Sequence, residues 1–157
     1  MTRVAVCVAL MLHVGAPGIG AQSSQDLLWD AAMRGDTAGI RIAVAAGARV
    51  DSLDRRTSAN GRYALNWAAW HNQAPALLLL LQLGADIDAG NITGFTALHH
   101  AAENGSLEAA RALLKAGADF AKLTNGGATA EEVAASRDMA ALTQLLVDAR
   151  NGKLPDE

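Results

Sequence analysis

Glycines at one fixed interval constrain this chain more than any other feature of its sequence. Gly61, Gly94 and Gly127 follow one another at intervals of 33 residues, and the same interval separates Gly84 from Gly117. A fixed period of about 20 to 50 residues is typical of chains built from copies of one supersecondary unit. The sequence therefore predicts a repeat protein.

The composition favours close-packed helices within one compact domain. Of the 157 residues, 51% are apolar, whereas Phe, Tyr and Trp together make up only 4%. A β-sandwich usually takes more β-branched and aromatic residues than this. The formal net charge is −3 and the basic residues form no long run, so we expect no nucleic-acid partner, because phosphate binding needs concentrated positive charge.

The first 21 residues have the layout of a secretory signal peptide. Arg3 supplies a positive start, residues 4–14 are almost all apolar, and residues 15–21 are small and turn-prone. We expect cleavage near Ala21, and hence a periplasmic or secreted protein. The apolar run is shorter than the roughly 20 residues that span a bilayer, and a retained membrane anchor is the alternative interpretation.

The third glycine-delimited unit carries the clearest pattern. Residues 94–105 are GFTALHHAAENG, a leucine- and alanine-rich stretch follows, and Gly117-Ala-Asp119 closes the unit. This pattern resembles the ankyrin repeat, in which Thr-Pro-Leu-His, paired alanines, a loop glycine and a second helix precede Gly-Ala-Asp. Ala97 stands where the family usually has proline. The resemblance implies an all-α solenoid of stacked helix-turn-helix units with short β-hairpin-like turns.

The resemblance covers about residues 25–150, within a repeat domain predicted at 22–150 and followed by a flexible tail at 151–157. It divides the chain into four units, at about 25–53, 58–90, 91–123 and 124–150. Gly47 and Gly84 lie 37 residues apart rather than 33, so the first junction carries four extra residues. No unit buries its own apolar face, so we expect stability to come from stacking of neighbouring units.

Local signals agree with this arrangement. Paired alanines recur at one place in each first helix and let neighbouring helices approach closely, at 31–32, 68–69, 101–102 and 134–135. The run Leu77–Leu81 suits a helix that is covered on several sides. Thr129 and Glu132 predict a capping box, and Pro75 is tolerated only in the first turn of its helix.

The candidate catalytic and metal-binding residues form no recognisable site. The resemblance implies that His99 ties helix to turn by hydrogen bonds. His100 points about 100° away around the same helix and His71 lies in another unit, so we expect no metal site. Cys7, the only cysteine, leaves with the signal peptide, and no Gly-x-Ser-x-Gly motif occurs. We predict no enzyme activity, no cofactor and no metal.

The resemblance also implies a binding surface, because partners of such repeats usually bind a concave groove lined by the turns and the exposed ends of the first helices. The corresponding positions are Met33, Arg34, Asn60, Arg62, Trp70, His71, Ile92, Phe95, Glu103, Asn104 and Arg137. Trp70 and Phe95 are the leading candidates, because aromatic and Arg side chains dominate interface energetics. The alternative is that Trp70 only completes local packing, as we expect for Trp67 and Trp29.

The four extra residues add basic side chains beside this surface. Arg55 and Arg56 lie close in sequence to Arg62. A basic finger beside Trp70 suits an acidic or carboxylate-bearing partner, and an ordinary solvated loop is the alternative.

The sequence thus predicts an exported, non-catalytic, monomeric module that binds another protein through its concave groove. It predicts contact with neither nucleic acid nor, after signal cleavage, a membrane. The alternative function is an inhibitor or protective companion of an extracytoplasmic enzyme.

Overall fold

The structure, a computed structural model, describes residues 22–153. The predicted signal peptide with its cleavage site, and the last four residues of the predicted tail, lie outside the described residues. Within that range the chain forms eight α-helices and no strand. The helices are α1 (Ser24–Arg34), α2 (Thr37–Ala45), α3 (Ala64–Trp70), α4 (Ala74–Gln82), α5 (Ala97–Asn104), α6 (Leu107–Lys115), α7 (Ala130–Ser136) and α8 (Ala140–Arg150).

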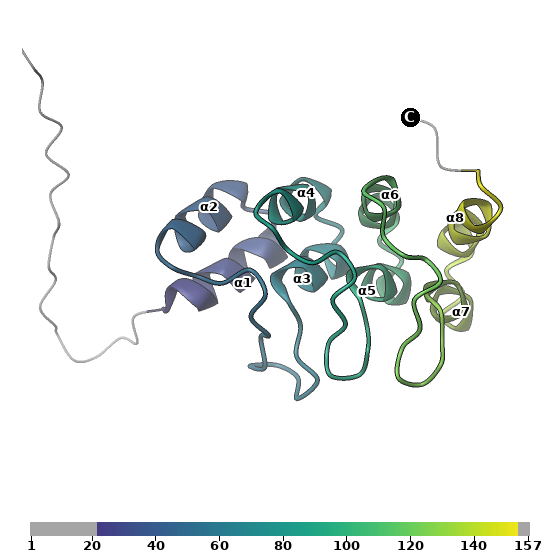
Figure 1. The fold of residues 1–157 in the computed structure, drawn as a ribbon, viewed down its shortest axis with the longest axis horizontal. Helices are drawn as coiled ribbons and strands as arrows, with labels where there is room; N and C mark the ends of the chain where they lie inside the picture. The colour runs from purple at the N-terminus through teal and green to yellow at the C-terminus, as the bar shows by residue number, and fades with distance from the viewer. Residues whose placement is uncertain (1–21, 154–157) are drawn as a thin grey trace, which may run out of the picture.

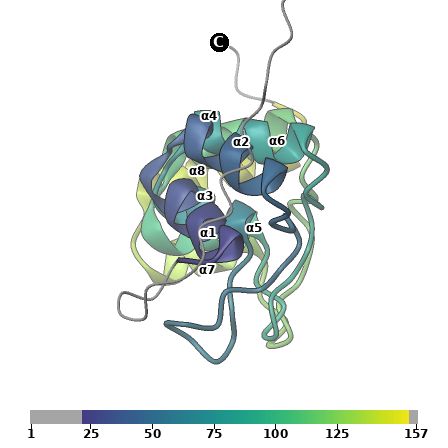
Figure 2. The same cartoon turned by 90° about the vertical axis from the view of Figure 1, so that its left-hand side faces the viewer.

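The helices lie in two rows, with odd-numbered helices in one row and even-numbered helices in the other (Figure 1). The segments that join one helix pair to the next project away from both rows on a single side, as the end-on view in Figure 2 also shows. We call α1, α3, α5 and α7 the inner row, α2, α4, α6 and α8 the outer row, and the projecting segments hairpins. This architecture confirms the predicted all-α solenoid, and its four helix pairs agree with the predicted number of units. None of the helices from residue 22 to residue 153 is long and apolar enough to cross a membrane.

The paired alanines are the contact points of the inner row. Ala32, Ala68, Ala69 and Ala102 are fully buried, because a methyl side chain is small enough for the next helix to pack against it directly. Ala135 differs and is exposed, since no further helix pair covers α7 on that side.

The leucine run of α4, in the outer row, is mostly buried. Leu77 and Leu80 of α4 are fully buried, but Leu78 is 44% exposed. This burial agrees with the prediction of a helix covered on several sides, and Leu78 lies on the one face of α4 that has no layer above it.

The helix starts follow the signals in the sequence. The Thr129 hydroxyl accepts from the Glu132 N–H while the Glu132 carboxylate accepts from the Thr129 N–H, which confirms the capping box at α7. Thr96 and His99 form the same reciprocal cap at α5. Pro75 lies in the first turn of α4, as expected.

The turn between the two helices of each pair requires a left-handed residue. Gly35 and Gly105 occupy this position with φ of 73° and 69°. Asn72 and Asp138 occupy it in the other two units, with φ of 57° and 58°, and these residue types tolerate such a backbone better than most others do.

The hairpins are tied to one another by backbone hydrogen bonds. The Ile92 N–H donates to the carbonyl of Asn60 (3.1 Å), and the Asn125 N–H donates to that of Thr93 (3.0 Å). Within the first hairpin, Asp54 and Arg62 form an isolated antiparallel bridge. The three hairpins therefore form one connected surface beside the inner row.

Candidate functional site

Arg62 lies at the centre of the surface where the first hairpin meets α3. Its guanidinium carbon is 4.6 Å from the ring centre of Trp67 and 4.6 Å from that of Trp70, so the cation is stacked between two indoles. Among residues 22–153 no carboxylate lies within ion-pair distance of this guanidinium, and its buried Nε has no hydrogen-bond partner. Burial lowers the pKa of Arg62, with the carboxylates of Glu103 and Asp54 opposing that effect.

His100 of α5 faces Arg62 from the neighbouring unit. The side chain is only 3% exposed, and neither ring nitrogen has a hydrogen-bond partner in the described part of the chain. The Trp70 ring meets it edge-on at 5.9 Å, and the Phe95 ring lies 5.5 Å away. Burial lowers the pKa of His100, despite the nearby Glu103 carboxylate, so the imidazole is neutral at neutral pH.

Glu103 is the acidic member of this cluster and is already paired. Its Oε1 accepts a hydrogen bond from Arg137 Nη2 at 2.7 Å, whereas its Oε2 lies 3.7 Å from His100 Nδ1, beyond hydrogen-bond distance. The contact with His100, followed by the charges of Arg137 and Arg62, lowers the pKa of Glu103. The carboxylate therefore stays ionised, and Arg137 balances its charge.

These side chains line a cavity of about 150 Å³ between the first and second hairpins, which we call the Arg62 pocket. It brings together five residues that the sequence predicted for the binding surface. They are Asn60, Arg62, Phe95 and Glu103 in its lining, with Trp70 as the indole stacked on Arg62.

The other predicted residues lie around the pocket or away from it. His71 stacks on Trp67, with ring centres 5.9 Å apart, and Ile92 is 48% exposed at the tip of the second hairpin. The Asn104 amide donates to the carbonyl of Trp70 at 2.7 Å and thus helps to end α3. Met33 and Arg34 lie at the end of α1, in the first unit.

Trp70 and Phe95 are half-buried rather than fully exposed. Trp70 packs against Arg62 and His100, and Phe95 packs against His99 and His100. Both rings therefore complete local packing, which is the alternative interpretation of Trp70. Phe95 also lines the Arg62 pocket, whereas Trp70 is connected to it only by stacking on Arg62. Trp67 and Trp29 are 6% and 8% exposed, as expected for core residues.

Arg56 differs from the predicted basic finger because it points back into the protein. It donates from Nε and Nη2 to Asp54 at 2.9 and 3.0 Å, and it also pairs with Asp30 at 2.9 Å and Asp26 at 3.3 Å. Both arginines are exposed, but Arg55 forms no ion pair in residues 22–153, whereas Arg56 is held by three carboxylates. The three arginines thus form no common finger, since Arg56 is held by carboxylates and Arg62 by indoles.

Asp54 organises this hairpin, and sequence reasoning missed it. The carboxylate is 1% exposed and accepts hydrogen bonds from Arg56 and from Trp67 Nε1 at 3.0 Å. Burial raises the pKa of Asp54, but the hydrogen bonds and charge of Arg56 and the hydrogen bond of Trp67 outweigh burial, and the net shift is downward. The Asp-x-Arg spacing was the available signal, because an aspartate commonly accepts from the backbone N–H two residues on. No signal in the sequence pointed to the unpaired ring nitrogens of His100.

His99 has the structural role that the resemblance implies. Its Nδ1 lies 2.8 Å from the Thr96 hydroxyl, and its Nε2 lies 3.2 Å from the carbonyl of Ala128 in the next hairpin. Across residues 22–153, no group of three or more His, Cys, Asp or Glu side chains is placed to hold a metal ion.

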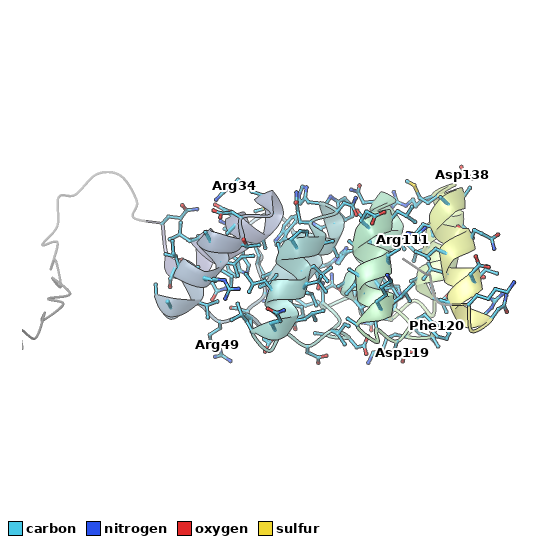
Figure 3. The ribbon with its side chains drawn as sticks, turned by 90° about the horizontal axis from the view of Figure 1, so that it is seen from above. Arg34, Arg49, Arg111, Asp119, Phe120 and Asp138 are labelled. Atoms are coloured by element: carbon cyan, nitrogen blue, oxygen red, sulfur yellow. The ribbon has the colours of Figure 1, made fainter. Side chains whose placement is uncertain are left out.

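A larger groove lies on the outer row between α4 and α6. Its volume is about 880 Å³, and its lining includes Leu78 and Arg111; Figure 3 shows Arg111 on the outer side of α6. The polar groups there are solvated, and Arg111 approaches Glu108 only at 3.9 Å. The Arg62 pocket is smaller, but in the described residues it alone combines a buried unpaired imidazole with an arginine whose buried Nε has no hydrogen-bond partner.

Two family models match the chain. The model described as ankyrin repeats (3 copies) matches residues 88–155, and the model described as ankyrin repeat matches residues 60–92. Together they cover three of the four helix pairs, and α1 and α2 repeat the same geometry ahead of them.

Curated relatives match over parts of their length. The chain is 36% identical over 98 residues to the ankyrin repeat domain-containing protein 13B of human and of mouse, covering 61% of this chain and 16% of each relative. It is 36% identical over 67 residues to the palmitoyltransferase AKR1 of Saccharomyces cerevisiae, covering 43% of this chain and 9% of that protein. The chain thus spans less than a fifth of the length of these relatives.

Proposed function

Because the chain belongs to the ankyrin-repeat family, we propose that it binds another protein through the surface formed by its hairpins and inner helices. Ankyrin repeats are generally non-catalytic modules that bind other proteins, and stacked repeats use their extended concave surface for this purpose. The single observation that carries the proposal is the Arg62 pocket, where aromatic rings and an arginine gather at the middle of that surface. Such residues dominate the energetics of protein interfaces.

Site-specific crosslinking tests this proposal without disturbing the fold. A photo-crosslinking side chain replaces Ile92, which is 48% exposed on a hairpin tip, or Leu78, which is 44% exposed on the outer row. The two positions match in exposure and residue size, so each serves as the control for the other. The proposal expects partner adducts from position 92 and none from position 78.

The opposite pattern, with adducts only from position 78, would place the partner on the outer row and overturn the proposal. Replacing Trp70 and Phe95 is a less clean test, because both rings pack against buried histidines and their loss would destabilise the domain.

We propose further that the mature protein is exported and monomeric. The support for export is the sequence pattern of residues 1–21. Mass spectrometry of the protein from its native host is expected to give an N-terminus at Gln22, and analytical ultracentrifugation is expected to give the mass of one chain. A retained residue 1 would contradict cleavage.

The identity of the captured partner separates a scaffold from an inhibitor or protective companion. If the partner is an enzyme, its turnover is measured with and without this protein. A fall in turnover supports inhibition, slower thermal inactivation supports protection, and no change in either supports scaffolding.

A further inference from the structure

We infer that the Arg62 pocket is a recognition site for the side-chain carboxylate of an aspartate or glutamate on the partner protein. This inference rests on the proposed function and specifies the chemistry at the centre of the binding surface.

The guanidinium of Arg62 has N–H donors that make no hydrogen bond in the described residues. A guanidinium carries five N–H donors in a rigid fork that matches a carboxylate, and those of Arg62 make no hydrogen bond to any residue from 22 to 153. The flanking rings of Trp67 and Trp70 hold the plane of the fork in place. Trp67 is itself fixed by its hydrogen bond to Asp54. A fork that is already oriented loses little conformational entropy when it binds a carboxylate.

His100 supplies a second unused donor to the same cavity. The residue is only 3% exposed, lines the Arg62 pocket, and has no hydrogen-bond partner at either ring nitrogen within the described residues. A buried polar group without a hydrogen bond is costly. A neutral imidazole always carries one N–H. Both ring nitrogens are shielded from solvent in this structure, so an anion bound to Arg62 reaches this donor once a side chain lining the pocket rotates. The two donors come from neighbouring units, so only the stacked fold brings them together.

The balance of charges selects an anion. The nearby acids are both occupied, because Asp54 accepts from Arg56 and Trp67, and Glu103 accepts from Arg137. Arg62 is therefore the unbalanced charge of the pocket, and an incoming carboxylate neutralises it. Bidentate pairing with arginine is among the strongest hydrogen-bonded contacts in proteins.

The size and place of the cavity favour a side chain over a larger ligand. Small-molecule sites usually enclose about 300 to 1,000 Å³, whereas the Arg62 pocket measures about 150 Å³. It lies between the first and the second of the three hairpins, and the exposed Ile92 belongs to the second. A partner chain laid along the row of hairpins continues on both sides of the pocket, so an internal acidic side chain fits better than a chain terminus.

The test is an NMR titration of the full chain with the blocked peptide acetyl-Gly-Glu-Gly-amide, followed at the indole N–H signals of Trp67 and Trp70. Acetyl-Gly-Gln-Gly-amide is the uncharged control, and acetyl-Gly-Gly-Gly with a free C-terminus and inorganic phosphate are the competing anions. The variants are Arg62→Gln and the matched Arg55→Gln, which removes an exposed arginine from the same hairpin. Unfolding midpoints in urea check that both variants are folded.

We expect saturable shifts with the Glu peptide and affinity lower by about tenfold or more for the Gln peptide. Arg62→Gln is expected to weaken Glu-peptide binding by about tenfold or more, whereas Arg55→Gln changes it by less than about twofold. Equal shifts with both peptides, equal effects of the two variants, or tighter binding of phosphate or of the free C-terminus would each overturn the inference.

Two readouts keep the inference separate from the proposed function. If Arg62→Gln fails to fold, the arginine Nε–H signal of Arg62 in the wild-type chain replaces the variant, and no response to the Glu peptide overturns the inference. If crosslinks from position 92 persist at wild-type yield in Arg62→Gln, the carboxylate inference is overturned, whereas the proposed protein-binding function still stands.

Discussion

The two arginines on opposite sides of the first hairpin differ in whether carboxylates pair with them. Arg56, on the side that faces α1, stacks on Trp29 at 5.0 Å and pairs with the carboxylates of Asp54, Asp30 and Asp26. Arg62, on the side that faces α5, also stacks on indoles but pairs with no carboxylate in residues 22–153. An arginine whose charge is satisfied locally thus fixes the hairpin, whereas one without a carboxylate partner on the same hairpin is available to a partner protein.

The neighbouring helices explain the difference. α1 presents Asp26 and Asp30 to the hairpin from positions one helical turn apart. α5 presents His100 and Glu103 at the corresponding side, but the imidazole carries no negative charge and Glu103 is taken by Arg137.

The largest effect in this comparison is expected from Arg56→Ala. It leaves the buried Asp54 carboxylate without its cation, which costs about 3 to 5 kcal/mol for a fully buried pair. Because the Arg56 side chain is 36% exposed, solvent screening lowers the expected loss in unfolding free energy to about 2 to 3 kcal/mol. Urea denaturation at neutral pH measures it.

Arg55→Ala is the matched control for that variant. Arg55 is exposed and forms no ion pair in the described range, so its loss is expected to change the unfolding free energy by less than about 0.5 kcal/mol. Equal losses of unfolding free energy in Arg56→Ala and Arg55→Ala would contradict the claim that Arg56 stabilises the hairpin and Arg55 does not.

The second effect is the loss, in acid, of the stabilisation that the Asp54–Arg56 ion pair provides. The pKa of Asp54 is lowered in the folded protein from its ordinary value of 3.8, so its stabilisation is complete above that value and disappears as the pH falls through the lowered pKa. The stability difference between wild type and Arg56→Ala is therefore expected to shrink by roughly half or more when denaturation is repeated below the folded-state pKa. A difference that stays constant into strong acid would show that Asp54 is not the partner that matters.

A smaller effect is expected from Trp67→Phe. Trp67 contacts the hairpin at two residues, Asp54 and Arg62. The change keeps an aromatic ring beside Arg62 but removes the Nε1 hydrogen bond to the buried Asp54 carboxylate. Hydrogen bonds to charged groups contribute about 1.5 to 3 kcal/mol, and the remaining Arg56 contacts limit the expected loss to about 1.5 kcal/mol. Thermal and urea unfolding measure it, and Trp29→Phe, which loses a bond to the neutral carbonyl of Ser52, is the paired control.

Among the variants that remove a stacked or hydrogen-bonded side chain, the smallest effect on stability is expected from Arg62→Ala. The variant loses two cation–π contacts of about 0.5 to 1 kcal/mol each, but it also removes a partly desolvated charge that has no carboxylate partner. These contributions oppose each other, so the unfolding free energy is expected to change by less than about 1 kcal/mol. A loss as large as that of Arg56→Ala in the same urea assay would mean that Arg62 also serves the fold.

The sequence predicted the parts of this molecule that repeat. Paired alanines recur in frame in each unit, a local sequence pattern gives the cap at Thr129, and the family resemblance gives the role of His99, so these features could be located without the structure. The pairing of Arg56 with Asp26 and Asp30, and of Arg137 with Glu103, joins residues 26 to 34 positions apart. No local pattern specifies which carboxylate a given arginine meets across two units, and so the sequence predicted a shared basic finger that the fold does not form.

The most direct test of the account records the Nε–H signals of Arg56 and Arg62 by heteronuclear NMR in one sample during titration with acetyl-Gly-Glu-Gly-amide. The account predicts a saturable shift of the Arg62 signal while the Arg56 signal stays in place, because its donors already serve Asp54 and Asp30. A shift at Arg56 with none at Arg62, or equal shifts at both, would contradict it.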